Sequence, residues 1–264
     1  MRKYWAIVKI GFKNALTYRA DFFLWGFNEF LGTLVFLFIW SVIFGEKGRI
    51  GGFSLPETIT YLIGVGLINN IISTAASRFI QRDVQSGRLS NLILIPLNYP
   101  LVRLFLSLSA KPVNLLIRFF AYFAVALFFK GKLVVSSNFP MILLTPISVV
   151  FAFAINFLVD YLTGCISFWT ITTEGPEGIV RTIKNIFSGN YAPISFFPPG
   201  FQVIANFLPF IYIQYFPMLI YLGKVSTIEA IKGIGLQIFW VVVLYFLARA
   251  VWRKGLKKYE GVGI

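Results

Sequence analysis

The sequence predicts an all-α integral membrane protein with six transmembrane helices, an N-terminal interfacial helix and re-entrant helices between spans five and six. Hydrophobic residues make up 58% of the 264 residues and charged residues only 13%, against about 25% in soluble domains. Apolar runs long enough to cross a bilayer recur along the chain. The net charge of +14 suits loops facing anionic membrane lipid rather than nucleic acid, because no basic patch of soluble-domain pattern accompanies it.

Residue types that the chain lacks exclude several kinds of site. There is one cysteine, Cys165, and no histidine, which excludes disulfides within the chain, histidine-ligated zinc and Ser-His or Cys-His nucleophile pairs. The phosphate-loop pattern G-x-x-x-x-G-K-[ST] does not occur. The acidic residues are scattered, with no spacing that favours a catalytic pair. We therefore expect a chain that is not an enzyme and has no metal or cofactor of its own.

The N-terminal part predicts an interfacial helix followed by the first span. Residues 1–20 form a basic amphipathic pattern, in which Trp5, Val8 and Phe12 share one helical face and lysines lie largely on the other. The first span follows over 22–44, where 23 residues reach roughly 34 Å, enough for a hydrocarbon core of about 30 Å. The remaining spans are expected at 58–77, 101–129, 140–170, 179–197 and 227–252.

Prolines interrupt the apolar sequence around and after the fifth span. No straight helix can run through them, because each removes a backbone donor and clashes with the preceding turn. Broken apolar segments at membrane depth must be buried in protein or line a cavity, so we predict re-entrant or interfacial helices over 198–223. Five residues at turns in and just before this region either shape the re-entrant helices or form an outer gate. The candidates are Tyr191, Pro193, Pro198, Pro209 and Pro217.

Lysine and arginine residues set the expected orientation. With six spans and both termini in the cytoplasm, seventeen of them fall on the cytoplasmic side and six on the other, in agreement with the positive-inside rule. Seven spans would place one terminus, with its five basic residues, outside. We expect a single membrane domain, 1–264, in the plasma (cytoplasmic) membrane.

Two charged residues fall inside expected spans. Arg118 lies in the third span and Asp160 in the fourth. A central arginine costs about 2.5–3.5 kcal/mol on insertion scales, so its side chain should face protein, water or the interface. Arg118 and Asp160 form a structural ion pair, or they contact a substrate or a gate, or the spans end elsewhere; the sequence leaves all three open.

The segment 78–100 interrupts the apolar sequence with charges and turn residues. Two helical turns can form before Gly87, which can end them with a positive φ. A second short amphipathic stretch then carries Leu89 and Leu92 until Pro96 stops it. Either its apolar side chains insert into a groove on a partner, or the segment is a plain loop between two spans.

Here the chain resembles the ABC-2 type transporter permeases. Their cytoplasmic loop is similar to the pattern Asp83-x-x-x-Gly87-x-Leu89-x-x-Leu92-x-x-x-Pro96. The sequence around it is similar to a subgroup of small permeases that includes viologen-exporter-like systems. SFW at 167–169, YAPISFFP at 191–198 and YFP at 215–217 continue the resemblance over nearly the whole chain.

The resemblance implies the permease subunit of an ATP-binding cassette exporter. Such permeases work as like or unlike dimers on two separate ATPase subunits, which hold ATP and Mg²⁺. Their coupling helix lies between spans two and three, here 79–95. Arg88 and Leu89 depart from the broader family, which often has Thr or Glu near the glycine, so the ATPase partner stays open. The residues implied in coupling are Arg82, Asp83, Gly87, Arg88, Leu89, Leu92 and Pro96.

The substrate is not specified. Aromatic-rich spans suit an amphipathic organic compound, held by apolar and cation–π contacts. The alternative function is an ion-gradient-driven secondary transporter, which needs several buried polar residues at mid-membrane and usually a repeat. A membrane-embedded enzyme would need paired catalytic groups. Asp160 alone gives either alternative little support.

Overall fold

The computed structural model consists of helices, and no strand forms in the part of the chain that it describes, which confirms the all-α class. The described residues are 2–17, 19–45, 48–109, 111–129, 131, 133–136, 138–170 and 174–259. The helices are α1 (Arg2–Thr17), α2 (Arg19–Phe44), α3 (Leu55–Ile72), α4 (Ala76–Gln85), α5 (Arg88–Leu94), α6 (Tyr99–Ser109), α7 (Lys111–Phe128), α8 (Phe139–Cys165), η2 (Ile166–Phe168), α9 (Glu174–Phe187), η3 (Ile194–Phe196), α10 (Pro199–Asn206), η4 (Pro209–Tyr212), α11 (Tyr215–Tyr221) and α12 (Thr227–Lys258).

The structure offers three to four candidate membrane spans among its described residues. Three helical stretches are long and apolar enough by themselves: Leu55–Gln85, Phe139–Phe168 and Thr227–Lys258. A fourth results if Arg88–Leu94 and Tyr99–Val113, which meet at 106°, are counted as one bent span. The expected number of six spans is therefore not confirmed.

The expected fifth span is not one straight helix. Instead of extending over 179–197, α9 begins at Glu174 and ends at Phe187. Two residues later Gly189 has a φ of 78°, which only glycine adopts readily, and Pro193 follows. With 14 residues, α9 rises about 21 Å, short of a hydrocarbon core of about 30 Å.

Two other expected spans are divided. The expected span 58–77 is broken at residues 73–75, where α3 ends and α4 begins. The expected span 101–129 corresponds to α6 and α7, and the residue between them lies outside the described residues. The sixth expected span starts at Thr227, as α12 does, but the helix continues to Lys258.

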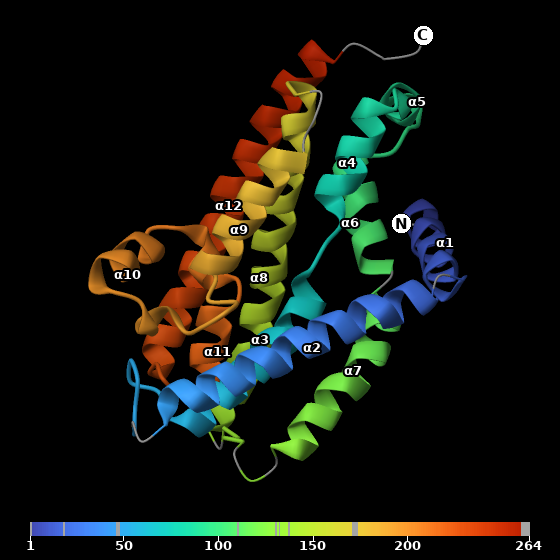
Figure 1. The fold of residues 1–264 in the computed structure, drawn as a ribbon. Helices are drawn as coiled ribbons and strands as arrows, with labels where there is room; N and C mark the ends of the chain where they lie inside the picture. Colours follow the sequence, from blue (N-terminus) through green and yellow to red (C-terminus); the bar gives the residue numbers. More distant parts are fainter. Residues whose placement is uncertain are drawn as a thin grey trace.

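Two long helices, α8 and α12, lie side by side and run in the same direction (Figure 1). Helices α4 and α5 lie at the end of the molecule where α8 and α12 finish (Figure 1). The end of α7 and the start of α8 lie at the opposite end (Figure 1). Helix α1 packs against α6, and α2 packs against α3 and α7.

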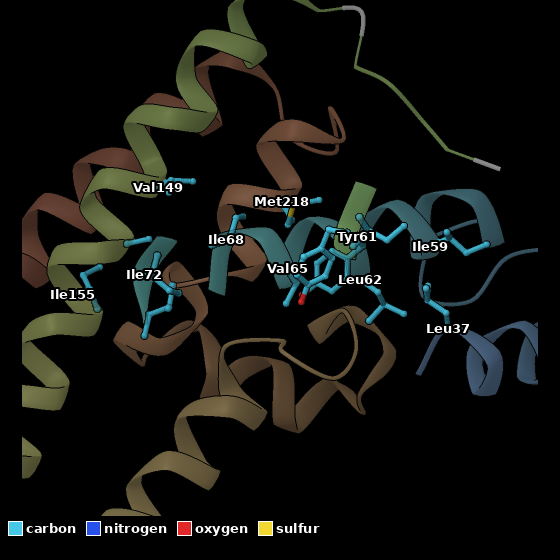
Figure 2. Close-up of a cluster of buried hydrophobic side chains, with 14 of the residues drawn as sticks. Leu37, Ile59, Tyr61, Leu62, Val65, Ile68, Ile72, Val149, Ile155 and Met218 are labelled. Carbon is cyan, nitrogen blue, oxygen red and sulfur yellow. The ribbon is translucent and has the colours of Figure 1, made fainter. Parts of the chain in front are cut away.

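The largest apolar core forms where α3 meets α8 and α11. Ile68 and Ile72 of α3 lie near Ile155 of α8, and Met218 of α11 lies beside the middle of α3 (Figure 2). Tyr61 of α3 is completely buried, and its hydroxyl donates a 2.6 Å hydrogen bond to the carbonyl of Gly189. The core thus joins the second expected span to the proline-rich region after α9.

Close packing of α4 on α8 depends on Gly164. A Cβ at this position would lie 2.9 Å from Cβ of Ile80 and 3.0 Å from Cα of Ser77. Because Ser77 Cα is backbone, α4 would have to shift. We predict that Gly164→Ala lowers the free energy of unfolding by about 1–3 kcal/mol, measured by thermal unfolding in detergent.

The matched control is Gly235→Ala on α12, where a Cβ would meet nothing within 4 Å. Alanine favours a helix over glycine by up to about 1 kcal/mol, so this variant should be as stable as the wild type or more stable. Equal melting temperatures for the two variants would contradict the packing described for Gly164.

Candidate functional site

Helices α4 and α5 and the residues up to Pro96 form a bent segment, which we call the elbow (76–96). Helix α4 ends at Gln85, and Gly87 has a φ of 72°, the left-handed conformation predicted for it. Helix α5 ends at Leu94, two residues before the proline. The two short helices of the elbow therefore end close to Gly87 and Pro96, as the sequence predicts.

An apolar cluster anchors the elbow to α8 and α12. Ile80 and Leu89 are completely buried and belong to a cluster with Phe157, Tyr161 and Ala248. Leu92 is half-buried against the same cluster. Leu89 is predicted to insert into a partner, but in the structure its side chain is completely buried within the chain, because α5 packs back on α4 after the turn at Gly87.

The exposed part of the elbow lies at the end of α5. Leu94 is 83% exposed, and Ile93 and Ile95 are 44% and 45% exposed. We call residues 93–95 the tip. Arg82, Arg88 and Pro96 are also exposed. The surface that the elbow offers to a partner is therefore the apolar tip with arginines nearby, and the predicted coupling residues divide into buried anchors and exposed positions.

Asp83, the remaining coupling residue, belongs to a buried polar cluster. Its carboxylate forms an ion pair with Arg103 and accepts a 2.5 Å hydrogen bond from the hydroxyl of Tyr99. The Arg103 guanidinium lies 4.8 Å from the centre of the Tyr99 ring, which stacks on Trp252 of α12 at 4.9 Å. Since a buried charge must be paired, these contacts fix the elbow to α6 and, through Trp252, to α12.

The sequence interpretation missed Arg103 and Tyr99 as partners of Asp83. A signal exists: the two lie four residues apart on one face of an otherwise apolar helix. An arginine in such a helix needs a carboxylate partner, and Asp83 is the one acidic residue in 78–100.

A second polar site surrounds the break between α3 and α4, residues 73–75. Three backbone carbonyls near the break accept hydrogen bonds from side chains of other helices. Lys111 Nζ of α7 donates to the carbonyl of Asn70 at 3.0 Å and to that of Ser73. Asn156 Nδ2 of α8 donates to the carbonyl of Ile72 at 2.8 Å. These three carbonyls, which have no helical hydrogen-bond donor at the break, thus accept hydrogen bonds from side chains instead.

Asp160 links the break to α9. Its Oδ2 accepts hydrogen bonds from Thr74 Oγ1 at 2.5 Å and from Asn156 Nδ2 at 3.3 Å. Its Oδ1 forms an ion pair with Lys184 Nζ at 2.6 Å. Lys184 is thus an ion-pair partner of Asp160 that the sequence analysis did not name. The alternatives that involve Arg118 stay predictions, because its side chain lies outside the described residues.

The residues proposed for an outer gate lie in the segment from the end of α9 to the first turn of α11. The indole nitrogen of Trp40 in α2 donates to the carbonyl of Tyr191 at 3.1 Å, and the Tyr191 ring stacks on Phe36 at 5.4 Å. Pro193 and Pro198 immediately precede η3 and α10. Pro209 starts η4, and Pro217 lies in the first turn of α11. Prolines fit at these starting positions because helix N-termini leave backbone donors unused.

The described residues contain no group of three or more histidine, cysteine or acidic side chains that could hold a metal ion. The two polar sites instead hold lysine and arginine against carboxylates and backbone carbonyls. Such contacts hold neighbouring helices in place relative to one another.

The buried pair in the elbow can be tested by a double-mutant cycle. Arg103→Met leaves Asp83 buried without its cation, so we predict a loss of about 3–5 kcal/mol in the free energy of unfolding. Adding Asp83→Asn should recover part of this loss, because no charge is then buried alone. Arg82→Met, an exposed neighbour, should stay within about 0.5 kcal/mol of the wild type. Equal losses for Arg103→Met and Arg82→Met would contradict the pairing.

Comparison with known families agrees with these features. The sequence matches the family described as ABC-2 family transporter protein over residues 30–263, a range that contains the elbow, the break and α9 to α12. No curated protein matches the chain. Because the family match covers most of the sequence, the chain belongs to the ABC-2 transporter family of membrane proteins.

Proposed function

We propose that this chain is the permease subunit of an ATP-binding cassette exporter and that a separate ATPase subunit docks on the elbow. The observation that carries the proposal is the apolar tip, held outward by a firmly anchored segment. Leu94 is 83% exposed, whereas Leu89, five residues earlier, is completely buried. An apolar surface of this kind, beside exposed arginines, is typical of a protein-docking site.

The lengths of two candidate spans support an elbow outside the membrane. Leu55–Gln85 has 31 residues and Thr227–Lys258 has 32. At 1.5 Å per residue the continuous helix α12 reaches about 48 Å, well beyond a hydrocarbon core of about 30 Å. The first stretch continues past its break at 73–75 to the end of α4. Both finish at the end of the molecule where α5 lies (Figure 1), so the excess length can hold the elbow in water.

Basic residues support a cytoplasmic position for this end. Arg78, Arg82 and Arg88 lie on the elbow, and Lys257 and Lys258 close α12. Positive residues concentrate on the cytoplasmic side of membrane proteins, which is also where an ATPase finds ATP. In this proposal ATP and Mg²⁺ are bound by the partner, and both termini are cytoplasmic.

The contacts suggest how a movement of the elbow reaches the membrane part. A push on the tip acts on α8 and α12 through the anchoring cluster around Leu89, and on α6 through Asp83 and Arg103. The same push acts on α3 across the break, where the backbone can change direction without losing an α-helical hydrogen bond. Thr74, Asp160 and Lys184 then connect the break to α9. Hinges of this kind, at helix ends, absorb the changes in φ and ψ during domain movements.

The proposal includes a second permease, identical or similar, with the substrate path between the two. An amphipathic organic substrate and membership of the viologen-exporter-like subgroup remain parts of this proposal. The ion-gradient alternative receives no added support, because both carboxylate oxygens of Asp160 are occupied by Thr74, Asn156 and Lys184. We therefore propose no chemical reaction for this chain itself.

The docking role of the tip is tested by Leu94→Asp. A charge at an exposed position should leave the permease folded but prevent apolar docking, so we predict that an ATP-binding cassette ATPase no longer co-purifies from native membranes. The partner is identified by mass spectrometry and by ATP hydrolysis in the purified sample.

Val135→Asp is the matched control. Val135 is 77% exposed, and it lies between α7 and α8, at the end opposite the elbow. This variant should retain the ATPase. An ATPase that remains bound at the wild-type level to Leu94→Asp would contradict docking at the tip.

A further inference from the structure

A cavity of about 800 Å³ lies between the elbow and α6 on one side and α8 and α12 on the other. Ile93 at the tip, Tyr99 and Leu104 line the first side. Phe157 of α8 and Trp252 of α12 line the second. The cavity therefore adjoins the anchoring cluster but is separate from the break and from the outward face of the tip.

The walls of the cavity are mostly apolar, and some of the residues that line it are exposed at the surface of the chain. Val150, at one end of the row that α8 contributes, is 66% exposed, and Tyr245 of α12 is 52% exposed. The row on α8 extends from Val150 to Tyr161, which at 1.5 Å per residue is about 16 Å. This length is close to half of a hydrocarbon core of about 30 Å, the depth of one leaflet.

Two arginines line the same cavity near the end where the elbow lies. Arg249 and Arg253 are four residues apart on α12, so both project from one helix face. Both are exposed, and neither guanidinium forms a hydrogen bond or an ion pair with another residue in the described part of the chain. The lining contains no acidic residue. The cavity therefore combines an apolar wall with two available positive charges.

Tyr161 supplies an independent indication of a ligand. Its side chain is only 2% exposed, and its hydroxyl has no hydrogen-bond partner among the described residues, although it lines the cavity. The Tyr161 ring lies 5.6 Å from the ring of Trp252, which stands between the two arginines in sequence. A buried hydroxyl without a partner is costly, and an oxygen of a bound molecule at this level would accept its hydrogen bond.

We propose that this cavity binds one anionic phospholipid from the leaflet at the elbow's end of the molecule. The phosphate lies at Arg249 and Arg253, an acyl chain lies along the row that includes Phe157, and Tyr161 donates to a lipid oxygen. Basic pockets between membrane helices bind anionic headgroups in this manner. The two arginines disfavour a cationic occupant. Since Ile93 and Tyr99 form the opposite wall, the lipid connects the elbow to α8 and α12, whether or not an ATPase docks on the tip.

The test is lipid binding to the purified, delipidated full chain. Phosphatidylglycerol is titrated in detergent, and the one-to-one complex is quantified by native mass spectrometry. We expect the wild type to bind it about tenfold more tightly than phosphatidylcholine with the same chains. Arg249→Gln with Arg253→Gln should weaken binding of phosphatidylglycerol by about tenfold or more.

The matched control is Lys254→Gln with Lys257→Gln, which removes the same charge from the same end of α12 outside the cavity. It should change binding less than about twofold, and an equal loss for both pairs would overturn the proposal.

Tyr161→Phe keeps the ring and all charges and should weaken binding about threefold to tenfold. This variant still tests the proposal if the arginine variant does not fold. Glycerol phosphate should not displace the lipid; displacement, or a wild type that binds no lipid, would also overturn the proposal.

Discussion

The backbone between α3 and α4 opens at residues 73–75, within a stretch that is otherwise apolar and long enough to span a membrane. An opened helix leaves carbonyls without their usual partners, and each costs about 1–3 kcal/mol when buried and unpaired. Lys111 and Asn156 donate to three of these carbonyls, and Thr74 donates to Asp160. Helices α7 and α8 supply these donors, and α9 is joined to the break indirectly, because Lys184 pairs with Asp160.

The elbow depends on the break, because α4 can leave the direction of α3 only there. Once redirected, α4 lies close against α8 at Gly164, and Leu89 enters the aromatic cluster shared with α12. The buried pair of Asp83 and Arg103 adds a contact with α6. What remains exposed is the tip, while the cavity lined by Arg249 and Arg253 lies behind it. Docking surface and lipid cavity are thus two sides of one segment.

Local features of this chain could be predicted from the sequence because they depend on a few neighbouring residues. Gly87 and Pro96 end helices for backbone reasons alone, and Thr227 begins α12 after a capping serine. The direction of Leu89 could not be predicted, since both faces of α5 carry apolar residues and only the fold decides which is buried. The ion-pair partner of Asp160 could not be predicted either, because Lys184 lies in another helix and hydropathy does not specify which charged residues pair. Apolar length alone also did not predict that the helix in 179–197 ends at Phe187, before Gly189 and Pro193.

Hydrogen exchange reports whether side chains from other helices hold the open backbone of the break. Exchange of the backbone amides over 70–80 is followed by mass spectrometry in the wild type, in Lys111→Met and in Lys232→Met, whose lysine is exposed on α12. Loss of the Lys111 ammonium should make local opening easier by about 1–3 kcal/mol, which accelerates exchange in this segment about fivefold to hundredfold. Lys232→Met should exchange as the wild type does. Unchanged exchange over 70–80 in Lys111→Met would contradict the account.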